Sequence, residues 1–277
     1  MPAGDATGTP LVSFILPTCN RADVVSQAIS MCLLQTYRNV EVLVWDDGST
    51  DETEAVVHRY SDVDKRVRYF KDTVNRGVGY ARNRLLEKAK GKYIAFQDSD
   101  DLSTKIRIEF QVRAIEATGA PFVRTAYSWK GEQSVAFAKR TPYVVNLINH
   151  SVPTILFRKE AGAAFKENLM CGSDMVWELE TVLKSGLGIY LPFELYVLRR
   201  HRRDRLSCRS HQDYWKKSWK RSNGVLVPLR ESLRDQVKAK YGDRLVNLPP
   251  PALLGELYAD VINRNWRKSA NLIGTPQ

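Results

Sequence analysis

Residues 92–101 (KYIAFQDSDD) decide the fold class, because an apolar run ends there in an acidic cluster. We interpret residues 92–97 as a short buried strand and residues 98–101 as the turn at its carboxyl end. Carboxylates one residue apart at a strand end, such as Asp98 and Asp100, are able to point toward the same ion. Their hard oxygen donors suit Mg²⁺ or Mn²⁺, particularly when the phosphates of a substrate complete the coordination shell. A solvated acidic turn is the alternative interpretation.

The residues upstream of this cluster alternate between strand patterns and helix patterns. Short apolar or alternating runs predict strands, and apolar residues at helical spacing predict helices between them. The predicted strands are residues 11–16, 40–45 and 66–70, and the predicted helices are residues 22–34, 50–60 and 78–90. Ser49 and Glu52 have the spacing of a capping box, which predicts the start of the second helix. Strands that alternate with helices predict an α/β fold, with a mostly parallel sheet and helices on both faces.

The downstream half of the chain is less regular. Its pattern predicts helices at residues 104–118 and 174–184, and extended segments at residues 121–129, 152–158 and 189–199. From about residue 204 onward, Trp and Tyr mix with Lys and Arg in a helical pattern, which Pro228 and the prolines at 249–251 interrupt. We interpret this last part as a helical C-terminal extension and not as a separate domain.

Two more polar clusters follow predicted strands, and in sheets of this kind ligands bind beyond the carboxyl ends of the strands. Residues 17–21 (PTCNR) follow the first strand, and Asp46 and Asp47 end the second. A carboxylate there is able to accept hydrogen bonds from a base N–H or from ribose hydroxyls, although a turn with a helix cap also explains the pattern. We expect the three clusters to converge at one edge of the sheet.

Residues 75–83 (NRGVGYARN) open the third predicted helix. They contain GxG without the third glycine of a dinucleotide-binding fingerprint, and they do not follow the first strand, which argues against a Rossmann oxidoreductase. We predict that the side chains of Arg76 and Arg82 face a bound diphosphate. Solvated arginines at a flexible helix entry are the alternative interpretation.

Composition limits the class of protein. Of the 277 residues, 43% are hydrophobic and 26% are charged, which suits a large core and argues against disorder. Lys and Arg total 42 against 31 acidic residues, a formal net charge of +11, which favours nucleotide phosphates, phospholipid surfaces or nucleic acid as partners. No stretch approaches the roughly 20 apolar residues of a membrane span. The cysteines have no CxxC spacing, so we expect a cytoplasmic protein with reduced thiols.

Taken together, these motifs resemble the family 2 glycosyltransferases, which have the GT-A fold. The matching stretches are residues 12–21 (VSFILPTCNR), 32–37 (CLLQTY), 40–53 (VEVLVWDDGSTDET) and 75–101, with a weaker resemblance onward to about residue 207. The resemblance implies a nucleotide-sugar-binding half (11–101) and an acceptor-binding half (102–204). The composition outside this region predicts a flexible tail (1–10) and a basic helical C-terminal extension (205–277).

The same resemblance assigns roles to individual residues. Those that would bind the nucleotide-sugar are Pro17, Thr18, Asn20, Arg21, Asp46, Asp47, Arg76, Gly77, Arg82, Asp98 and Ser99. Asp47 would contact the base, and Asp100 would hold the metal, Mn²⁺ or Mg²⁺. His201 would be a further metal ligand, with an exposed histidine in a basic run as the alternative. Asp174 would be the catalytic base, although Ser173 replaces the glutamate that usually precedes it in the family.

The activity that the resemblance implies is inverting transfer of a single sugar from a nucleotide-sugar, because the QxxRW signature of the processive members is absent. UDP is the commonest donor nucleotide of the family. The acceptor stays open among a glycan, a lipid carrier, a protein and nucleic acid. Two other classes also stay open. A metal-dependent nucleotidyltransferase would need a basic phosphate-binding loop in place of residues 17–21, and a basic nucleic-acid-binding protein or nucleic-acid-modifying transferase would leave the acidic clusters unexplained.

The C-terminal extension carries a basic aromatic segment, residues 211–221 (HQDYWKKSWKR). A helical pattern places Tyr214, Trp215 and Trp219 near one face, with lysines and arginine around them. Such a helix is able to lie peripherally on an anionic membrane, to stack on bases, or to pack its rings on the core. Our hypothesis is that the segment helps to hold an anionic acceptor or its carrier. The oligomeric state stays open.

Overall fold

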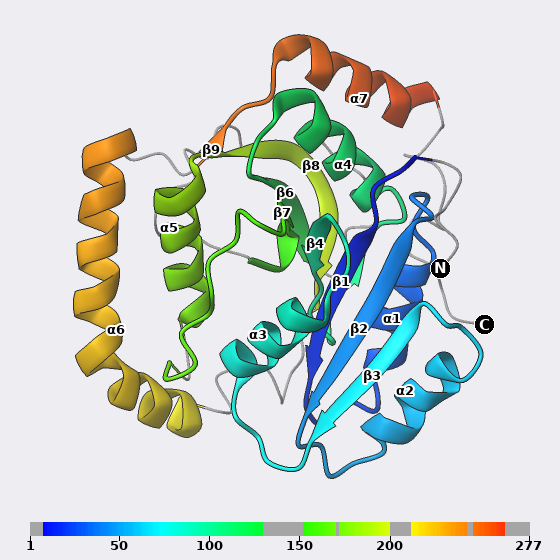
Figure 1. Cartoon of the computed structure of the whole chain (residues 1–277), viewed down its shortest axis with the longest axis vertical. Helices are drawn as coiled ribbons and strands as arrows, with labels where there is room; N and C mark the ends of the chain where they lie inside the picture. Colours follow the sequence, from blue (N-terminus) through cyan, green and yellow to red (C-terminus); the bar gives the residue numbers. More distant parts are fainter. Residues whose placement is uncertain (1–7, 130–151, 170–171, 200–211, 243–245, 264–277) are drawn as a thin grey trace.

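The structure is a computed structural model, and it describes residues 8–129, 152–169, 172–199, 212–242 and 246–263. Figure 1 shows a central twisted sheet with helices on both faces. The sheet contains nine strands among the described residues, in the order β3-β2-β1-β4-β7-β6-β8-β5, with β9 paired to β8. The first strands are β1 (Val12–Thr18), β2 (Val40–Asp47), β3 (Val67–Asp72) and β4 (Tyr93–Phe96). These four strands are parallel, so their carboxyl ends meet at one edge.

The second half of the sheet is mixed. Its strands are β5 (Leu102–Ser103), β6 (Phe122–Trp129), β7 (Ile155–Arg158), β8 (Gly188–Leu198) and β9 (Val246–Asn247). Strand β7 runs antiparallel to both β4 and β6, whereas β8 runs parallel to β6. Since β4 and β6 are both antiparallel to β7, they are parallel to each other. Strands β6 and β8 therefore end at the same edge as β1 and β4. The mostly parallel sheet that the sequence predicts is confirmed.

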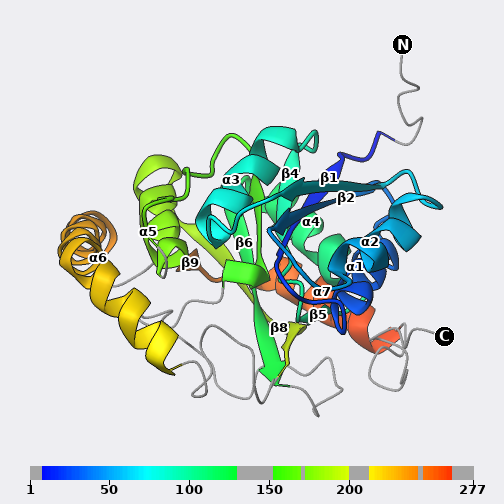
Figure 2. The same cartoon turned by 90° about the horizontal axis from the view of Figure 1, so that it is seen from below.

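The helices divide the core into two layers. On one face lie α1 (Val25–Leu33), α2 (Thr53–Ser61), α4 (Arg107–Thr118) and α7 (Pro251–Asn263). On the other lie α3 (Val78–Lys88), α5 (Ser173–Ser185) and α6 (Gln212–Tyr241). Figures 1 and 2 show α6 alongside α5 as an outer layer. In the described part of the chain, no helix is both long and apolar enough to cross a membrane.

Helix α6 reaches the start of α5 through a close contact. Leu226 is fully buried, and a Cβ added at Gly172 would lie 2.7 Å from its Cδ2 atom. Gly172 has a φ of +72°, in the left-handed region that favours glycine, and it is the residue just before α5. The C-terminal extension is therefore part of the packed protein and supports the beginning of α5.

Three local predictions were wrong. Helix α2 begins at Thr53 and has no side-chain cap, because the Ser49 hydroxyl is used by another turn of the chain. Residues 152–154, predicted as strand, form a 3-10 turn (Val152–Thr154) before β7. Pro228 does not interrupt α6, which is one helix from Gln212 to Tyr241. Figure 1 shows that this helix is bent.

Candidate active site

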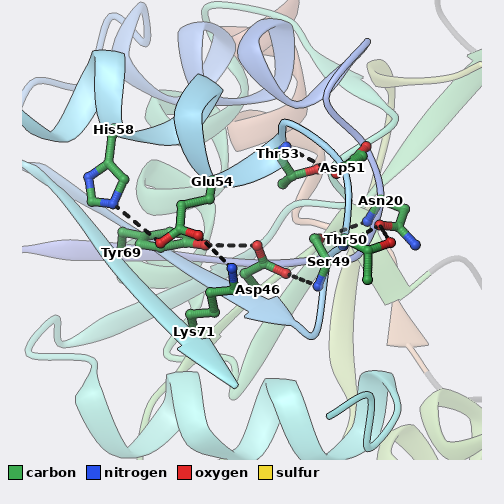
Figure 3. Close-up of polar contacts among 10 residues, drawn as sticks. All are labelled: Asn20, Asp46, Ser49, Thr50, Asp51, Thr53, Glu54, His58, Tyr69 and Lys71. Atoms are coloured by element: carbon green, nitrogen blue, oxygen red, sulfur yellow. Dashed lines mark hydrogen bonds and ion pairs between the residues drawn. The ribbon is translucent and has the colours of Figure 1, made fainter. Parts of the chain in front are cut away.

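The turns that follow β1 and β2 are joined by hydrogen bonds, as Figure 3 shows. Asn20 has a φ of +51°, which an asparagine tolerates better than most residues. In this conformation its backbone N–H donates to the Ser49 hydroxyl at 2.8 Å, and its side-chain oxygen accepts from the Thr50 N–H at 2.9 Å. The Arg21 N–H donates to the Thr53 hydroxyl at 2.8 Å. The turns after β1 (residues 17–21) and β2 (residues 46–49) are therefore held together as one surface, which we call the floor of the candidate site.

Asp46 is fully buried and is part of that floor. One carboxylate oxygen accepts from the Ser49 N–H at 2.8 Å, and the other accepts from the Tyr69 hydroxyl at 2.7 Å (Figure 3). Burial, followed by the hydrogen bond to Asp46, raises the pKa of Tyr69. With no exposed surface, Asp46 fixes the shape of the turn and offers no atom to a ligand in this conformation.

Asp47 lies on the opposite face of β2 and holds the entrance to α3. Its two oxygens accept from the backbone N–H groups of Arg76 at 2.9 Å and Gly77 at 2.7 Å. Burial raises the pKa of Asp47, and these two hydrogen bonds oppose the shift. The loop fits closely: a Cβ added at Gly48 would lie 2.8 Å from the Asn75 nitrogen. Gly77, with a φ of +93°, directs the chain into α3.

The acidic turn after β4 brings Asp98, Asp100 and Asp101 together, with one oxygen from each within 4.8 Å of the others. The side chains of Asp98 and Asp100 are 31% and 15% exposed. Asp101 is buried, and one of its oxygens accepts from the backbone N–H of Arg199 at 2.9 Å. Three hard oxygen donors at this separation fit the requirements of Mg²⁺ or Mn²⁺. Ser99, between them, is also buried.

Arginines surround this turn. The buried Arg82 guanidinium lies 3.1 Å from an Asp98 oxygen and against the rings of Phe96 and Phe165. Nε of Arg21 lies 4.0 Å from an Asp100 oxygen. Positive charge therefore stands on both sides of the carboxylates, in a place where a diphosphate would be attracted.

Arg76 differs from these two arginines. Its side chain is 53% exposed, pairs with Asp72 at 3.7 Å, and lies over the Tyr80 ring. Its backbone, not its guanidinium, makes the contact with Asp47. The structure thus brings Arg21 and Arg82 to the acidic turn, whereas the Arg76 side chain lies on the surface. Pro17 and Thr18 end β1 there, and Thr18 is buried.

Asp174 lies in the first turn of α5, which starts at the same edge of the sheet in Figure 1. One of its oxygens accepts from the Met175 N–H at 3.0 Å. The first turn of α3 adjoins this helix end, because a Cβ added at Gly79 would lie 3.5 Å from the Ser173 hydroxyl. His201 lies outside the described residues.

Glu178, one turn after Asp174, has a different environment. It is fully buried and forms an ion pair with Arg124 of β6, which is also buried. A carboxylate that is held in this way is a poor acceptor for the proton of a substrate. Asp174 is the more accessible of the two carboxylates on this face of α5.

Sequence reasoning missed the side chains beneath the acidic turn. Gln97 is fully buried, and its amide N–H groups donate to the carbonyl oxygens of Asp98 and Asp101. The Tyr196 hydroxyl accepts from the Asp98 N–H at 3.2 Å. Arg107 and Gln111 stand four residues apart on the buried side of α4. Two polar residues at that spacing in an otherwise apolar helix face were the available signal.

The fold and the acidic turn at the carboxyl edge define the class of protein as a glycosyltransferase with the GT-A fold. The sequence profile described as Glycosyl transferase family 2 matches residues 13–174, and the chain belongs to this family. This membership favours the sugar transferase over the nucleotidyltransferase and the nucleic-acid-binding protein that the sequence left open.

Individual relatives show the same likeness. An uncharacterized glycosyltransferase of Rickettsia felis is 35% identical over 191 residues, covering 64% of this chain and 31% of the relative. The protein named UDP-Glc:alpha-D-GlcNAc-diphosphoundecaprenol beta-1,3-glucosyltransferase WfaP of Escherichia coli is 36% identical over 117 residues, which are 42% of this chain and 46% of that protein. The matched region spans 31% to 41% of the length of the first curated relatives.

A solved structure confirms the fold. The mannosyltransferase PcManGT from Pyrobaculum calidifontis, in complex with GDP-Man and Mn²⁺, superposes with a TM-score of 0.58 and 19% sequence identity. The match covers 98% of this chain and 86% of the mannosyltransferase.

Proposed function

We propose that this chain is an inverting glycosyltransferase that moves one sugar from a UDP-sugar to a lipid-linked acceptor, with a divalent metal at the acidic turn. The observation that carries the proposal is the meeting of Asp98, Asp100 and Asp101 within 4.8 Å. This cluster lies at the edge where the strands that carry the nucleotide motif also end. Arg82 and Arg21 already contact Asp98 and Asp100, and a cation with the phosphates of a donor would offset the remaining negative charge.

The nucleotide would lie over the floor made by residues 17–21 and 46–49. Asp47 has its oxygens aligned by the N–H groups of Arg76 and Gly77, and a carboxylate oxygen has a second lone pair for a base N–H. Asp46 would act by fixing the turn, since it has no exposed surface. Asn20 joins the two turns that would line this part of the site.

The diphosphate would lie near the acidic turn. Asp98 and Asp100 would hold the metal, which when bound offsets the negative charge that grows on the leaving diphosphate. Arg82 and Arg21 would supply further positive charge, because they already contact these two carboxylates. Guanidinium groups suit this task since they form paired hydrogen bonds with phosphate oxygens.

In the transfer step, an acceptor hydroxyl oxygen would form a bond to the anomeric carbon while the bond from that carbon to the diphosphate breaks. Asp174 would take the hydroxyl proton, and the nucleoside diphosphate would leave with the bonding electrons. Attack from the opposite face inverts the anomeric configuration. Positioned general-base catalysis typically contributes about 10²- to 10⁴-fold to the rate.

The acceptor is proposed from the relatives. WfaP is named for a GlcNAc-diphosphoundecaprenol acceptor and a UDP-glucose donor, and it is 36% identical over the matched residues. The net charge of +11 suits a diphosphate-linked lipid or the anionic surface that carries it. The contribution of residues 211–221 stays a prediction, because their side chains lie outside the described part of the chain.

The experiment is a donor panel assayed with and without Mn²⁺ on a short-chain GlcNAc-diphosphate lipid. We expect release of UDP, dependence on the metal, and a β-linked product from an α-linked donor, measured by the anomeric proton coupling in NMR spectra. A product with retained configuration would contradict the inverting mechanism. Full activity after chelation would contradict the metal, and transfer only to soluble sugars would contradict the acceptor.

A further inference from the structure

Arg107 is a fully buried arginine at the first position of α4, directly beneath the acidic turn. In the described part of the chain, its hydrogen bonds go to carbonyl, amide and hydroxyl oxygens and none goes to a carboxylate. The acceptors are the Gln111 and Gln97 side chains, the Ser103 hydroxyl, and the carbonyl oxygens of Phe96, Pro153 and Ile155. All five N–H groups of the guanidinium have an acceptor within reach. A buried charge surrounded in this way needs a reason beyond core packing.

The hydrogen bonds of Arg107 lead to both ends of the acidic turn. Its guanidinium contacts the Phe96 carbonyl at 3.0 Å, where β4 ends, and the Gln97 side-chain oxygen at 3.4 Å. Gln97 in turn donates to the carbonyl oxygens of Asp98 and Asp101, each at 3.1 Å. A chain of hydrogen bonds thus runs from one side chain to the backbone of the residues that begin and close the turn.

Arg107 supports the turn by a second route. Its guanidinium carbon lies 5.0 Å from the centre of the Tyr196 ring, and the Tyr196 hydroxyl accepts from the Asp98 N–H. Burial lowers the pKa of Arg107 to about 10, so the side chain stays charged at neutral pH. Tyr196, Cys32 and Asp98, in that order, oppose this lowering of the pKa of Arg107.

We propose that Arg107 is the positioning residue of the acidic turn: through Gln97 and Tyr196 it holds the backbone that presents Asp98, Asp100 and Asp101 to a divalent cation. The inference rests on the proposed metal-binding function of this turn. Arg107 touches neither donor nor acceptor in this role, and it acts through the backbone of the residues that do. Partners outside the ligand set commonly change metal affinity by about 10- to 100-fold when they are mutated.

The test compares two Arg-to-Lys substitutions. Arg107→Lys keeps the charge but loses the planar fork that reaches several acceptors at once. The matched control is Arg158→Lys, because Arg158 also donates to main-chain oxygens, those of Ala120 and Ile115. Arg158 pairs with Tyr93 at the start of β4, at the opposite end of that strand from the acidic turn. Free Mn²⁺ is titrated by its EPR signal for the wild type and both variants, with and without UDP, and unfolding is followed in urea.

We expect Arg107→Lys to weaken Mn²⁺ binding by about 10- to 100-fold, whereas Arg158→Lys binds Mn²⁺ within about twofold of the wild type at a similar loss of stability. Equal Mn²⁺ affinities in all three folded proteins would overturn the positioning role alone. A wild type that binds no Mn²⁺, with or without UDP, would overturn the proposed metal site and the inference with it. Should Arg107→Lys not fold, Ser103→Ala, which removes one acceptor of Arg107 and one donor to Gln97, decides the matter. A severalfold loss of Mn²⁺ affinity supports the role, and an unchanged affinity contradicts it.

Discussion

The carboxylate of Asp47 accepts a hydrogen bond from the backbone N–H of Gly77 at 2.7 Å, which joins the carboxyl end of β2 to the residue just before α3. The backbone N–H of Arg76 donates a second hydrogen bond, to the other oxygen of the same carboxylate. One side chain thereby fixes the loop that borders the proposed nucleotide site. The contact explains how motifs 30 residues apart in the sequence act as one surface.

Asp47→Ala should weaken the binding of UDP, because it removes a proposed base contact and releases the loop before α3. We expect about a tenfold or greater rise in the dissociation constant by calorimetry, in line with the loss of a charge-assisted hydrogen bond. Asp64→Ala is the control, since Asp64 pairs with Arg66 just before β3, at the end of that strand away from the carboxyl edge. Equal affinities for the wild type and the Asp47 variant would remove Asp47 from the nucleotide site.

As the pH falls, UDP binding should begin to weaken at a higher pH than it would if Asp47 had the pKa of an ordinary aspartate. Burial raises the pKa of Asp47 above 3.8, and only the ionised form accepts from both backbone N–H groups and from a base. For stability the sign is opposite: a raised pKa favours the folded state while Asp47 is protonated. That contribution is present below the unfolded pKa and is lost as the pH rises through the folded pKa.

Urea unfolding and calorimetry between pH 3.5 and about pH 6.5, compared with Asp47→Asn, measure both effects. The asparagine variant should show a flatter dependence of unfolding free energy on pH. A variant with the same pH profile as the wild type would mean that the shifted pKa does not belong to Asp47.

Asp100→Ala should abolish metal-dependent transfer and leave the fold largely intact, because Asp100 is partly exposed and its ion pair with Arg21 is long, at 4.0 Å. The measurement is UDP release at saturating Mn²⁺, with the urea midpoint recorded in parallel. Asp62→Ala, a change at an exposed carboxylate on the end of α2, is the control. Full turnover by the Asp100 variant, or a wild type indifferent to chelator, would refute the metal assignment.

Asp174→Asn should bind donor almost normally and transfer sugar more slowly by about two or more orders of magnitude. The amide keeps the shape of the carboxylate but does not take a proton. Glu180→Gln on the same helix, where Glu180 pairs with Lys166 near the surface, provides the matched control. Transfer at the wild-type rate by the Asp174 variant would place the base elsewhere.

The basic aromatic segment should matter for the acceptor and not for the donor. The variant changes Lys216, Lys217, Lys220 and Arg221 to glutamine together. We expect transfer to the lipid acceptor to fall while hydrolysis of the UDP-sugar continues, because the removed charges would meet an anionic carrier. Both rates are measured at low and high salt. If neither protein responds to salt, and both transfer equally well, packing on the core is the role of the segment.

The arrangement of β1 to β4 and the place of the acidic turn could be predicted from local patterns. Strands β1, β2 and β4 are buried runs, and residues 17–21, 46–47 and 98–101 stand at their carboxyl ends. Contacts between distant turns could not be predicted in the same way. Ser49 looked like a helix cap, yet its hydroxyl serves Asn20, because the sequence does not tell which neighbour a short polar side chain will meet.

The contacts beneath the acidic turn were harder to predict from the sequence for a related reason. Strand β7 joins β4 and β6 in antiparallel orientation, and only the folded sheet brings the Pro153 and Ile155 carbonyls to Arg107. A buried arginine in a helix reads in the sequence as one more surface charge. Apart from Gln111 on the next turn, its hydrogen-bond partners lie outside α4, and the farthest, Ile155, is 48 residues away in the sequence.

The contact of Leu226 with Gly172 limits which substitutions this protein tolerates at position 172. Residue 172 has a backbone conformation that favours glycine, and a methyl group there would require the Leu226 side chain to move. A library that randomises position 172 should therefore return glycine most often, with asparagine next, because asparagine tolerates the left-handed region better than most residues. One that randomises positions 172 and 226 together should gain little, because a smaller residue at 226 frees space without removing the backbone strain. The choice of residue at position 172 is thus limited in part by a helix that lies beyond the region matched by the family profile.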